Sequence, residues 1–547
     1  MKNTPIIKIP PEPLFILNKL QESGFEAYIV GGAVRDTLVD ADSKAYNLTA
    51  SDYDFATSAK PEEIQKIFPE NFYENEFGTI SVTKTHLQEQ MGILVKDDET
   101  KGTESEKTEP NFEASPATND KTINLNEATK IHSSLMDSEK VKIAEKQGSV
   151  KKTTDPKEEV FEITTFRSDG EYKNHRKPED VVWGETLESD LGRRDFTINS
   201  MAIKFSTKFL ATLDFSKTNE LMKVDSNNFE IIDLYGGIND LKYQIIKTVG
   251  DPNKRFNEDA LRLLRAVRFS VQLNMQIDEK TYAAILKNAN LIEHISWERI
   301  RDEFLKMIKS DYPKEAIEIL DKTGLLKIII PELLEGKMVM QGGHHFADVW
   351  THSLDALNEC PSKDPIIRLA TLLHDIAKPR TLKIIDGKPT FYNHEIIGSR
   401  MAKNIAKRLR LSSEEIERIF ILVRYHMFHY QPENSDASIR RFMKKVGLEN
   451  INDILDVREA DRLGSGARKT SWRLEEMKQR MIEQLHQPFS VRDLKIDGND
   501  LMKELNLNPG KIIGEILNDL FEKVLDNPEL NTKEQLLEIA KNFTSAS

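Results

Sequence analysis

Strand-like segments are confined to the first part of this chain, and helical periodicity dominates the rest. Short apolar runs typical of β-strands occur at 27–30, 52–55, 79–83 and 160–166, whereas after about Lys242 apolar residues recur at helical spacing. Strands followed by a run of helices are typical of α+β proteins. We therefore predict a head with a mixed sheet and helices, followed by all-α domains.

A long segment between two of these strands has a different composition. Residues 88–158 are rich in Lys, Glu, Ser, Thr and Asn, and Phe112 is their only Phe, Tyr or Trp. Such a composition buries too little apolar surface to order a chain. We expect a disordered insertion here, and we expect the flanking strands, 79–83 and 160–166, to be neighbours in one sheet.

Composition excludes several classes of protein. The chain has 547 residues, enough for three to four domains at roughly 150 residues each. No apolar run approaches the roughly 18 residues of a membrane span, and the start lacks the apolar core of a secretory signal. We therefore expect a cytoplasmic protein without a membrane partner. A single cysteine, Cys360, excludes a multi-cysteine metal site, so any metal must be held by carboxylate or imidazole.

A net charge of −13 argues against a generally basic nucleic-acid coat. Contacts with RNA phosphates must then come from local basic patches, for example the arginines and lysines at 440–445. Solvated helix faces give the same pattern.

The first candidate site combines a pair of acids with a pair of glycines. Asp52 and Asp54 are separated by one residue in a predicted strand, so their carboxylates share a face and could hold Mg²⁺ for a triphosphate substrate. An acidic pair on a solvated turn is the alternative. Gly31 and Gly32 follow a predicted strand and precede a helix, where bare N–H groups can approach phosphate, although glycine pairs also make turns. Arg35, one turn later, could reach the same phosphate.

A third acid could join this pair. Alternation along 161–167 puts Glu162 on one face with Thr164 and Phe166, facing the sheet interior. There it could bind the metal or take the proton from an attacking hydroxyl. A strand-edge acid paired with Arg167 explains the segment equally well.

Six motifs occur in a fixed order along the chain. They are GGAVRD at 31–36, DYD at 52–54, RRDFTINSMA at 193–202, DLYGG at 233–237, EDALR at 258–262 and SWERI at 296–300. Together they resemble the bacterial tRNA nucleotidyltransferase and poly(A) polymerase family, the class II branch of the polymerase-β-like superfamily. The resemblance implies a polymerase-β-like nucleotidyltransferase head with Mg²⁺ at Asp52 and Asp54, and it implies tRNA, CTP and ATP as partners.

The resemblance also implies which residues contact the nucleotide, and helical spacing adds two arginines to them. Arg194 and Asp195 would contact the ribose and phosphates, and residues 258–262 would act as a protein template for the incoming base. Two further arginines follow at three-residue steps. The expected nucleotide-binding residues are Gly31, Gly32, Arg35, Arg194, Asp195, Asn199, Glu258, Asp259, Arg262, Arg265 and Arg268.

Spacing supports base recognition by Asp259 and Arg262. On a helix capped by Asn257 these two side chains are neighbours, and one accepts while the other donates. Cytosine and adenine fit such a pair, whereas uracil and guanine make both contacts repulsive. At about 1–3 kcal/mol for each unsatisfied group, two errors give roughly 30-fold to over 10⁴-fold discrimination. An ordinary salt bridge is the alternative.

A second candidate site lies in the helical part. Seven of the twelve histidines fall between His344 and His429. The sequence LLHDIAKP at 372–379 resembles the metal-dependent phosphohydrolase (HD) domain, in which a transition metal such as Ni²⁺, Mn²⁺ or Co²⁺ would activate water. The expected ligands are His352, His374, Asp375, His394, His426 and Asp461. A degenerate domain that serves only as an RNA-binding scaffold is the alternative.

Together these features predict a function and a domain order. We expect template-independent addition of CCA to tRNA 3′ ends, with a possible phosphodiesterase or phosphatase repair activity. A poly(A) polymerase, an enzyme adding only CC or only A, and an HD-type nucleotide or cyclic-phosphate hydrolase are the alternatives. The expected domains are a head at 1–240, a helical neck and body at 241–340, an HD domain at 341–470 and a helical tail at 471–547.

Overall fold

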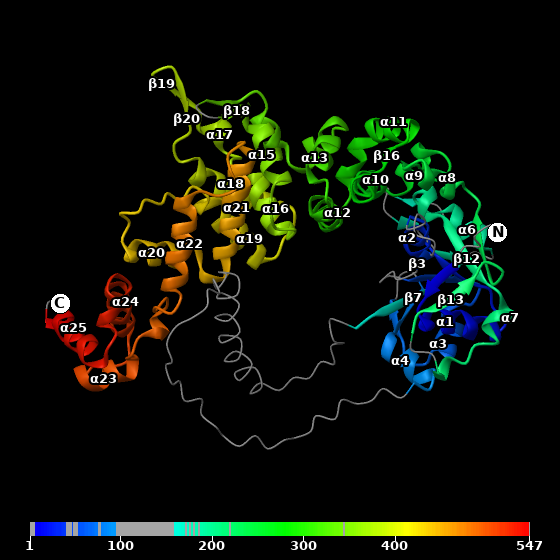
Figure 1. The fold of residues 1–547 in the computed structure, drawn as a ribbon, viewed down its shortest axis with the longest axis horizontal. Helices are drawn as coiled ribbons and strands as arrows, with labels where there is room; N and C mark the ends of the chain where they lie inside the picture. Colours follow the sequence, from blue (N-terminus) through cyan, green and yellow to red (C-terminus); the bar gives the residue numbers. More distant parts are fainter. Residues whose placement is uncertain are drawn as a thin grey trace. The chain divides into compact units, whose positions relative to one another are not determined.

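The computed structural model of this chain describes two compact units, the first ending at Ile329 and the second beginning at Ile330 (Figure 1). Asp52 and most of the predicted insertion lie outside the described residues. In the described part of the chain, no helix is long and apolar enough to cross a membrane. The described residues are 6–39, 46–47, 53–74, 78–93, 158–169, 172–173, 177–178, 181–183, 186–217, 220–342 and 345–545.

A seven-stranded mixed sheet forms the centre of the head, in the order β14-β12-β2-β4-β7-β6-β5. Neighbouring strands are antiparallel except β4 and β7, which are parallel. β6 pairs with β7, so the strands flanking the insertion are neighbours, as predicted. The strands are β2 (Ala27–Val30), β4 (Asp54–Thr57), β5 (Phe72–Glu74), β6 (Thr79–Thr83), β7 (Val160–Thr165), β12 (Met201–Phe205) and β14 (Phe229–Asp233).

A small second sheet joins β1 (Ile6–Ile9) to β13 (Met222–Asp225) and to β3 (Tyr46–Asn47). Four helices contact strands of the large sheet: α1 (Pro11–Glu22), α2 (Gly32–Val39), α3 (Pro61–Ile67) and α4 (Lys84–Gln90).

Helix α6 (Leu187–Gly192) covers part of the sheet. Its Leu187 and Leu191 pack in one apolar cluster with Tyr28 and Val30 of β2 and Ala56 of β4. Because strand side chains alternate between faces, Asp54 lies on the same face as Ala56. The apolar cluster therefore supports the strand end that carries the predicted acid.

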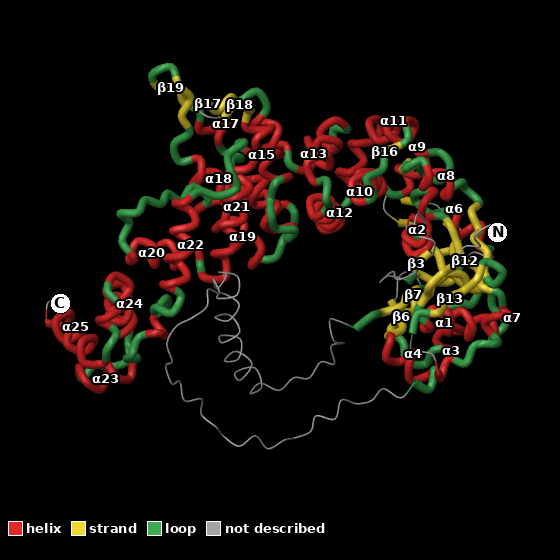
Figure 2. Tube along the Cα trace, in the orientation of Figure 1, coloured by secondary structure: helices red, strands yellow, loops and turns green. Residues whose placement is uncertain are grey.

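Helices complete the first unit after the sheet ends (Figure 2). α10 packs on α9, α12 and α13, which places the segment 258–272 in a helical core. The helices are α8 (Gly237–Lys242), α9 (Pro252–Glu258), α10 (Leu261–Gln272), α11 (Glu279–Asn288), α12 (Trp297–Lys309), α13 (Pro313–Lys322) and α14 (Leu326–Ile329).

The second unit is mainly helical, with two short antiparallel pairs, β17 (Met340–Gly342) with β18 (His345–Asp348) and β19 (Lys383–Ile385) with β20 (Lys388–Thr390). α15, α16, α19 and α21 pack together, and α18 packs on α19. The helices are α15 (Val349–Asn358), α16 (Pro365–Leu373), α17 (Lys378–Thr381), α18 (His394–Arg408), α19 (Ser413–Tyr425), α20 (Asp436–Val446), α21 (Ile451–Gly464), α22 (Trp472–Gln484), α23 (Gly498–Leu505), α24 (Lys511–Asp526) and α25 (Lys533–Ser545).

Candidate functional site

The glycine turn of the head lies where β2 ends and α2 begins. Gly31 has φ +77°, a left-handed conformation that favours glycine. A Cβ at this position would lie 3.2 Å from Asp54 Oδ2 and 2.9 Å from Arg194 Nη1. The turn therefore brings together bare backbone, a carboxylate and a guanidinium from three residues of the predicted site, Gly31, Asp54 and Arg194.

Two carboxylates lie side by side at this strand end. β4 and β7 are parallel and their register pairs Asp54 with Glu162. Neighbouring strands are about 4.8 Å apart, so both carboxylates can contact one cation. Glu162 is exposed while Phe161 and Ile163 are buried, so the prediction that Glu162 faces the sheet interior is wrong. Asp52 lies outside the described residues, and its place beside Asp54 stays a prediction.

A buried acid fixes two arginines beside the glycine turn. Arg194 Nε and Nη2 donate to Asp190 Oδ2 at 3.3 and 3.2 Å, and Arg193 Nη2 donates to Oδ1 at 2.8 Å. Burial raises the pKa of Asp190, but Arg194 and Arg193 outweigh burial and lower it overall. Asp190 was not predicted from the sequence, although it precedes the two arginines by three and four residues, which is a helical spacing.

Asp195 belongs to a hydrogen-bonded network with several predicted nucleotide-binding residues. Its Oδ1 accepts from the N–H of Phe196 at 2.9 Å and from Asn199 Nδ2 at 3.3 Å, and its Oδ2 accepts from Arg265 Nε at 2.6 Å. Arg35 Nη1 donates to Asn199 Oδ1 at 2.8 Å. Burial raises the pKa of Asp195, but the Arg265 guanidinium outweighs burial, so the group is held ionised.

Three arginines gather on one aromatic ring of α10. The guanidinium carbons of Arg35, Arg265 and Arg268 lie 5.4, 5.2 and 4.2 Å from the centre of the Phe269 ring. Arg268 also forms an ion pair with Glu303, with 2.6 Å between Nε and Oε2. This concentration of guanidinium groups suits a phosphate-bearing substrate.

The helix expected to carry the base-recognition residues is interrupted between them. α9 ends at Glu258 and α10 begins at Leu261, so Asn257 lies inside α9. The prediction of one helix capped by Asn257 is therefore wrong. Asp259 has extended backbone, with φ −138° and ψ 106°, and its Oδ1 accepts from the N–H of Leu261 at 3.0 Å. Asp259 thus satisfies a backbone donor at the start of α10.

Asp259 and Arg262 each engage a different partner. Asp259 Oδ2 accepts from Arg299 Nη2 at 2.7 Å. Arg262 is buried, and its Nη1 donates to Glu258 Oε2 at 2.5 Å while its Nη2 donates to the carbonyl of Arg193 at 2.9 Å. These contacts hold both side chains near the Arg193–Asp195 segment, but they do not form the mutual pair that the spacing suggested.

The six side chains expected to bind metal come together in the second unit. In each of two groups, the ligand atoms all lie within 4.8 Å of one another. The first group is His352, His374 and Asp461, and the second is Asp375, His394 and His426.

The Asp375 carboxylate joins these two groups. Its Oδ2 lies 3.1 Å from His374 Nε2 and 3.4 Å from His352 Nε2. Its Oδ1 lies 3.3 Å from His394 Nε2 and 3.7 Å from His426 Nε2. One oxygen faces each group, so Asp375 could offer one ligand atom to a cation in either group.

Backbone carbonyls orient three of the imidazole rings. Nδ1 of His374, His394 and His426 each lies 2.6–2.8 Å from the carbonyl oxygen three residues earlier. With the proton on Nδ1, each ring directs the lone pair of Nε2 into the cluster, which is the orientation of metal-binding histidines.

The spacing of the nitrogen donors fits shared ions. The Nε2 atoms of His352 and His374 are 3.1 Å apart, and those of His394 and His426 are 3.4 Å apart. Two nitrogens at about 2.1 Å from one ion lie about 3.0 Å apart at a right angle and about 3.4 Å apart at the tetrahedral angle. The donor set therefore fits a transition metal in either group.

Two basic residues that the sequence analysis missed hold the acids of this cluster. Lys378 Nζ lies 2.6 Å from Asp375 Oδ2, and Arg458 Nη1 lies 2.8 Å from Asp461 Oδ2. Burial raises the pKa of both acids, but the surrounding cations and imidazoles hold it well below its usual range. Burial lowers the pKa of His374, but the two carboxylates raise it overall to about 10. The cluster therefore favours positive charge, which a proton or a metal ion supplies.

Both units of the chain are similar to known proteins. The model of the poly(A) polymerase head domain matches residues 27–124 and 114–247, and a model of tRNA nucleotidyltransferase domain 2 matches residues 395–540. The CCA-adding enzyme of Ligilactobacillus salivarius is 29% identical over 96% of this chain and 95% of its own length. The A-adding tRNA nucleotidyltransferase of Deinococcus radiodurans is 31% identical over 61% of this chain and 75% of its own length.

A solved structure shares the fold along the whole chain. The crystal structure of the Bacillus stearothermophilus CCA-adding enzyme in complex with CTP matches with a TM-score of 0.59 and 22% identity, covering 98% of both chains. The sheet and its surrounding helices define the head as a nucleotidyltransferase domain. The chain belongs to the tRNA nucleotidyltransferase family.

Proposed function

We propose that this protein adds CCA to tRNA 3′ ends with CTP and ATP as substrates. The observation that carries the proposal is the convergence of Asp54, Glu162 and Arg194 at the Gly31 turn. The similarity to the Ligilactobacillus salivarius CCA-adding enzyme over nearly the full length of both chains supports it.

The head residues have separate roles in this proposal. Asp54, Glu162 and Asp52 would hold Mg²⁺, which neutralises charge on the triphosphate and lowers the pKa of the RNA hydroxyl. Arg194 and Arg35 bind phosphate oxygens. Glu162, which is exposed, can alternatively accept the proton of the attacking 3′-hydroxyl.

Base selection would come from Asp259 and Arg262 through exchange of their present partners. The amino group of cytosine or adenine takes the place of Arg299 as a donor to Asp259. The ring nitrogen beside it accepts from Arg262. Uracil and guanine present an acceptor to the acid and a donor to the arginine, so neither contact can form.

Relative incorporation of the four nucleotides tests this assignment. On a tRNA that ends before CCA, wild-type protein should prefer CTP over UTP by at least about 30-fold in kcat/KM, as expected for two unsatisfied polar groups. Asp259→Ala should lower kcat/KM for CTP more than kcat/KM for UTP, because only CTP loses a contact. The preference for CTP over UTP should therefore fall. A preference for CTP that survives in both Asp259→Ala and Arg262→Ala assigns base selection to other residues.

The buried cluster supports a second candidate function, which we also propose: metal-dependent hydrolysis of a phosphoester at a damaged RNA end. His352, His374, Asp375, His394, His426 and Asp461 would hold a transition metal, which would acidify a water molecule for attack on phosphorus of a 2′,3′-cyclic phosphate. One P–O bond to ribose breaks and the proton passes to the departing ribose oxygen, and a further hydrolysis releases phosphate. Such a reaction restores the hydroxyl that nucleotide addition requires.

Metal loading provides the test of the second function. Purified protein supplied with Ni²⁺, Mn²⁺ or Co²⁺ should open adenosine 2′,3′-cyclic phosphate, as measured by chromatography of the products. If none of these metals supports hydrolysis of a cyclic or terminal phosphate, the cluster is a structural or RNA-binding element instead.

A further inference from the structure

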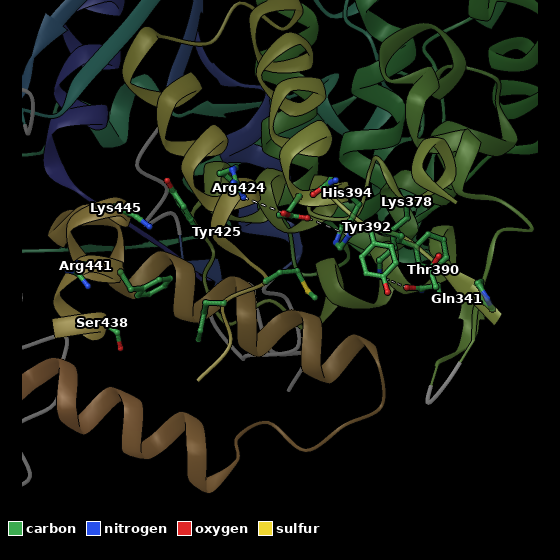
Figure 3. Close-up of a pocket in the computed structure, with 17 residues that line it drawn as sticks. Gln341, Lys378, Thr390, Tyr392, His394, Arg424, Tyr425, Ser438, Arg441 and Lys445 are labelled. Atoms are coloured by element: carbon green, nitrogen blue, oxygen red, sulfur yellow. Dashed lines mark hydrogen bonds and ion pairs between the residues drawn. The ribbon is translucent and has the colours of Figure 1, made fainter. Parts of the chain in front are cut away.

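A pocket of about 890 Å³ opens in the second unit beside the metal cluster (Figure 3). His394 of the cluster lines it, and so does Lys378, which is the ion-pair partner of the bridging Asp375. Pockets that bind small molecules measure about 300–1,000 Å³. The pocket therefore has room for a nucleotide and shares a wall with the cluster.

The charge of this pocket is opposite to that of the whole chain. Four cationic side chains line it, Lys378, Arg424, Arg441 and Lys445, and Glu395 is the one carboxylate among its lining residues. The chain as a whole has a net charge of −13. Ion pairs with Asp375, Glu395 and Asp526 balance Lys378, Arg424 and Arg441, so the positive charge left to attract a phosphate is mainly that of Lys445.

The pocket also presents aromatic rings. Phe428 and Phe442 pack against each other with ring centres 5.0 Å apart, which makes them a structural wall. Tyr392 is different because 71% of its surface is exposed, and it lies two residues before His394. An exposed aromatic ring that lines the same pocket as His394 is a surface on which a nucleic-acid base can stack.

We propose that this pocket binds the 3′-terminal nucleoside phosphate of an RNA, with the base on Tyr392 and an upstream backbone phosphate at Arg441 and Lys445. Figure 3 shows these two cations across the pocket from His394 and Lys378, so a chain that begins at the cluster can extend to them. Hydrolysis of the bound RNA end at the cluster rests on the proposed hydrolase activity. Binding of the RNA end in the pocket does not depend on that activity.

The two outer cations are not equivalent. Arg441 forms an ion pair with Asp526, whereas Lys445 forms no ion pair within the described part of the chain. Lys445 is also exposed and follows Arg441 by one helical turn on α20. Lys445 is therefore the residue whose charge is available to a phosphate, and its replacement breaks no ion pair among the described residues.

Calorimetric titration of full-length protein tests the binding. The first probe is adenosine 3′-monophosphate. Tyr392→Leu should weaken its binding about 5-fold to 150-fold, the range expected for loss of one base–aromatic stack. The matched control is Tyr243→Leu, which removes a tyrosine that is 67% exposed in the first unit and should leave binding unchanged. Unchanged binding in Tyr392→Leu overturns the proposal.

A second probe distinguishes an RNA end from a free nucleotide. For a tri-adenylate with a 3′-phosphate, Lys445→Ala should weaken binding about 2-fold to 5-fold at low salt and less at high salt, because an exposed ionic contact is lost. Binding of adenosine 3′-monophosphate should not change. Lys407→Ala, an exposed lysine on α18 outside the pocket, is the control. Equal trinucleotide binding by Lys445→Ala and wild type overturns the RNA part of the proposal.

Hydrolysis of two cyclic phosphates separates this proposal from the hydrolase assignment. Ethylene phosphate has the five-membered cyclic phosphate without a nucleoside, so Tyr392→Leu should hydrolyse it as wild type does while kcat/KM for adenosine 2′,3′-cyclic phosphate falls. Equal loss on both substrates overturns the proposed role of Tyr392. If wild type hydrolyses neither but Tyr392→Leu loses nucleotide binding, the hydrolase assignment fails and the pocket stands.

Discussion

Replacement of Gly31 by alanine tests whether the glycine turn builds the catalytic site of the head. The added Cβ would lie 2.9 Å from Arg194 Nη1 and 3.2 Å from Asp54 Oδ2. Because Arg194 Nη1 is the far end of a flexible side chain, the guanidinium is expected to move rather than the fold to break. We expect nucleotide incorporation to fall about 100-fold or more, since a displacement of about 1 Å in a catalytic group has effects of this size.

Gly31→Ala should lower the free energy of unfolding only modestly. The positive φ of Gly31 costs alanine about 1–2 kcal/mol, and the stiffer unfolded chain offsets about 0.4–1 kcal/mol of this. A net loss below about 1.6 kcal/mol lowers the melting temperature by no more than roughly 6 °C in a domain of this size.

The same fold provides a matched control. Gly24 has φ +88°, and a Cβ there would meet nothing within 4 Å. Gly24→Ala should therefore lose similar stability and keep wild-type activity. The measurements are thermal unfolding and the initial rate of CTP incorporation into a tRNA that ends before CCA. Equal activities of Gly31→Ala and Gly24→Ala would show that the turn does not position Arg194 and Asp54 for catalysis.

Three further changes have distinct expected outcomes. Asp54→Ala should abolish incorporation of both CTP and ATP with the circular dichroism spectrum unchanged, because the same metal site serves each addition; near-normal incorporation would remove Asp54 from catalysis. Deletion of residues 96–157 should leave incorporation and the melting temperature nearly unchanged, because loop length costs little; a folded, protease-resistant fragment from this segment would contradict that expectation. The double variant His374→Ala, Asp375→Ala should lose cyclic-phosphate hydrolysis and keep CTP incorporation, and a parallel loss of both would show that the two sites are not separable.

Much of the head follows from local patterns in the sequence. Short apolar runs located the strands at 27–30 and 79–83, and the two strands around the insertion pair as expected. Glu162 is exposed, although Ala56 and Phe166 on the same face are buried in the cluster with α6. Alternation assigns a side chain to a face, but how far a helix covers that face depends on distant elements.

The start of α10 shows a second limit. Asn257 was expected to cap one helix that carries both Asp259 and Arg262. In the structure Asn257 Nδ2 donates to the carbonyl of Asn253, and Asp259 accepts from the N–H of Leu261. The difference follows from the break between α9 and α10, which local sequence does not encode.

The metal cluster was predicted as a set of residues but not as an arrangement. The density of histidines and the motif at 372–379 predicted the candidate ligands, which span more than one hundred residues from His352 to Asp461. The position of Asp375 between the two groups depends on how α15, α16, α18, α19 and α21 pack. Lys378, three residues after Asp375, could have been suspected from its helical spacing.

Nucleotide addition to three tRNA ends tests the central proposal most directly. Labelled CTP and ATP are offered, separately and together, to tRNAs that end before CCA, after the first C and after CC, and the products are sequenced. The proposal predicts that CTP extends the first two substrates to CC, that ATP extends the third by a single A, and that both together restore CCA and stop. Addition of A alone to the third substrate, with no use of CTP on the first two, would contradict CCA addition and assign an A-adding activity. Continued addition of A beyond the first would assign a poly(A) polymerase.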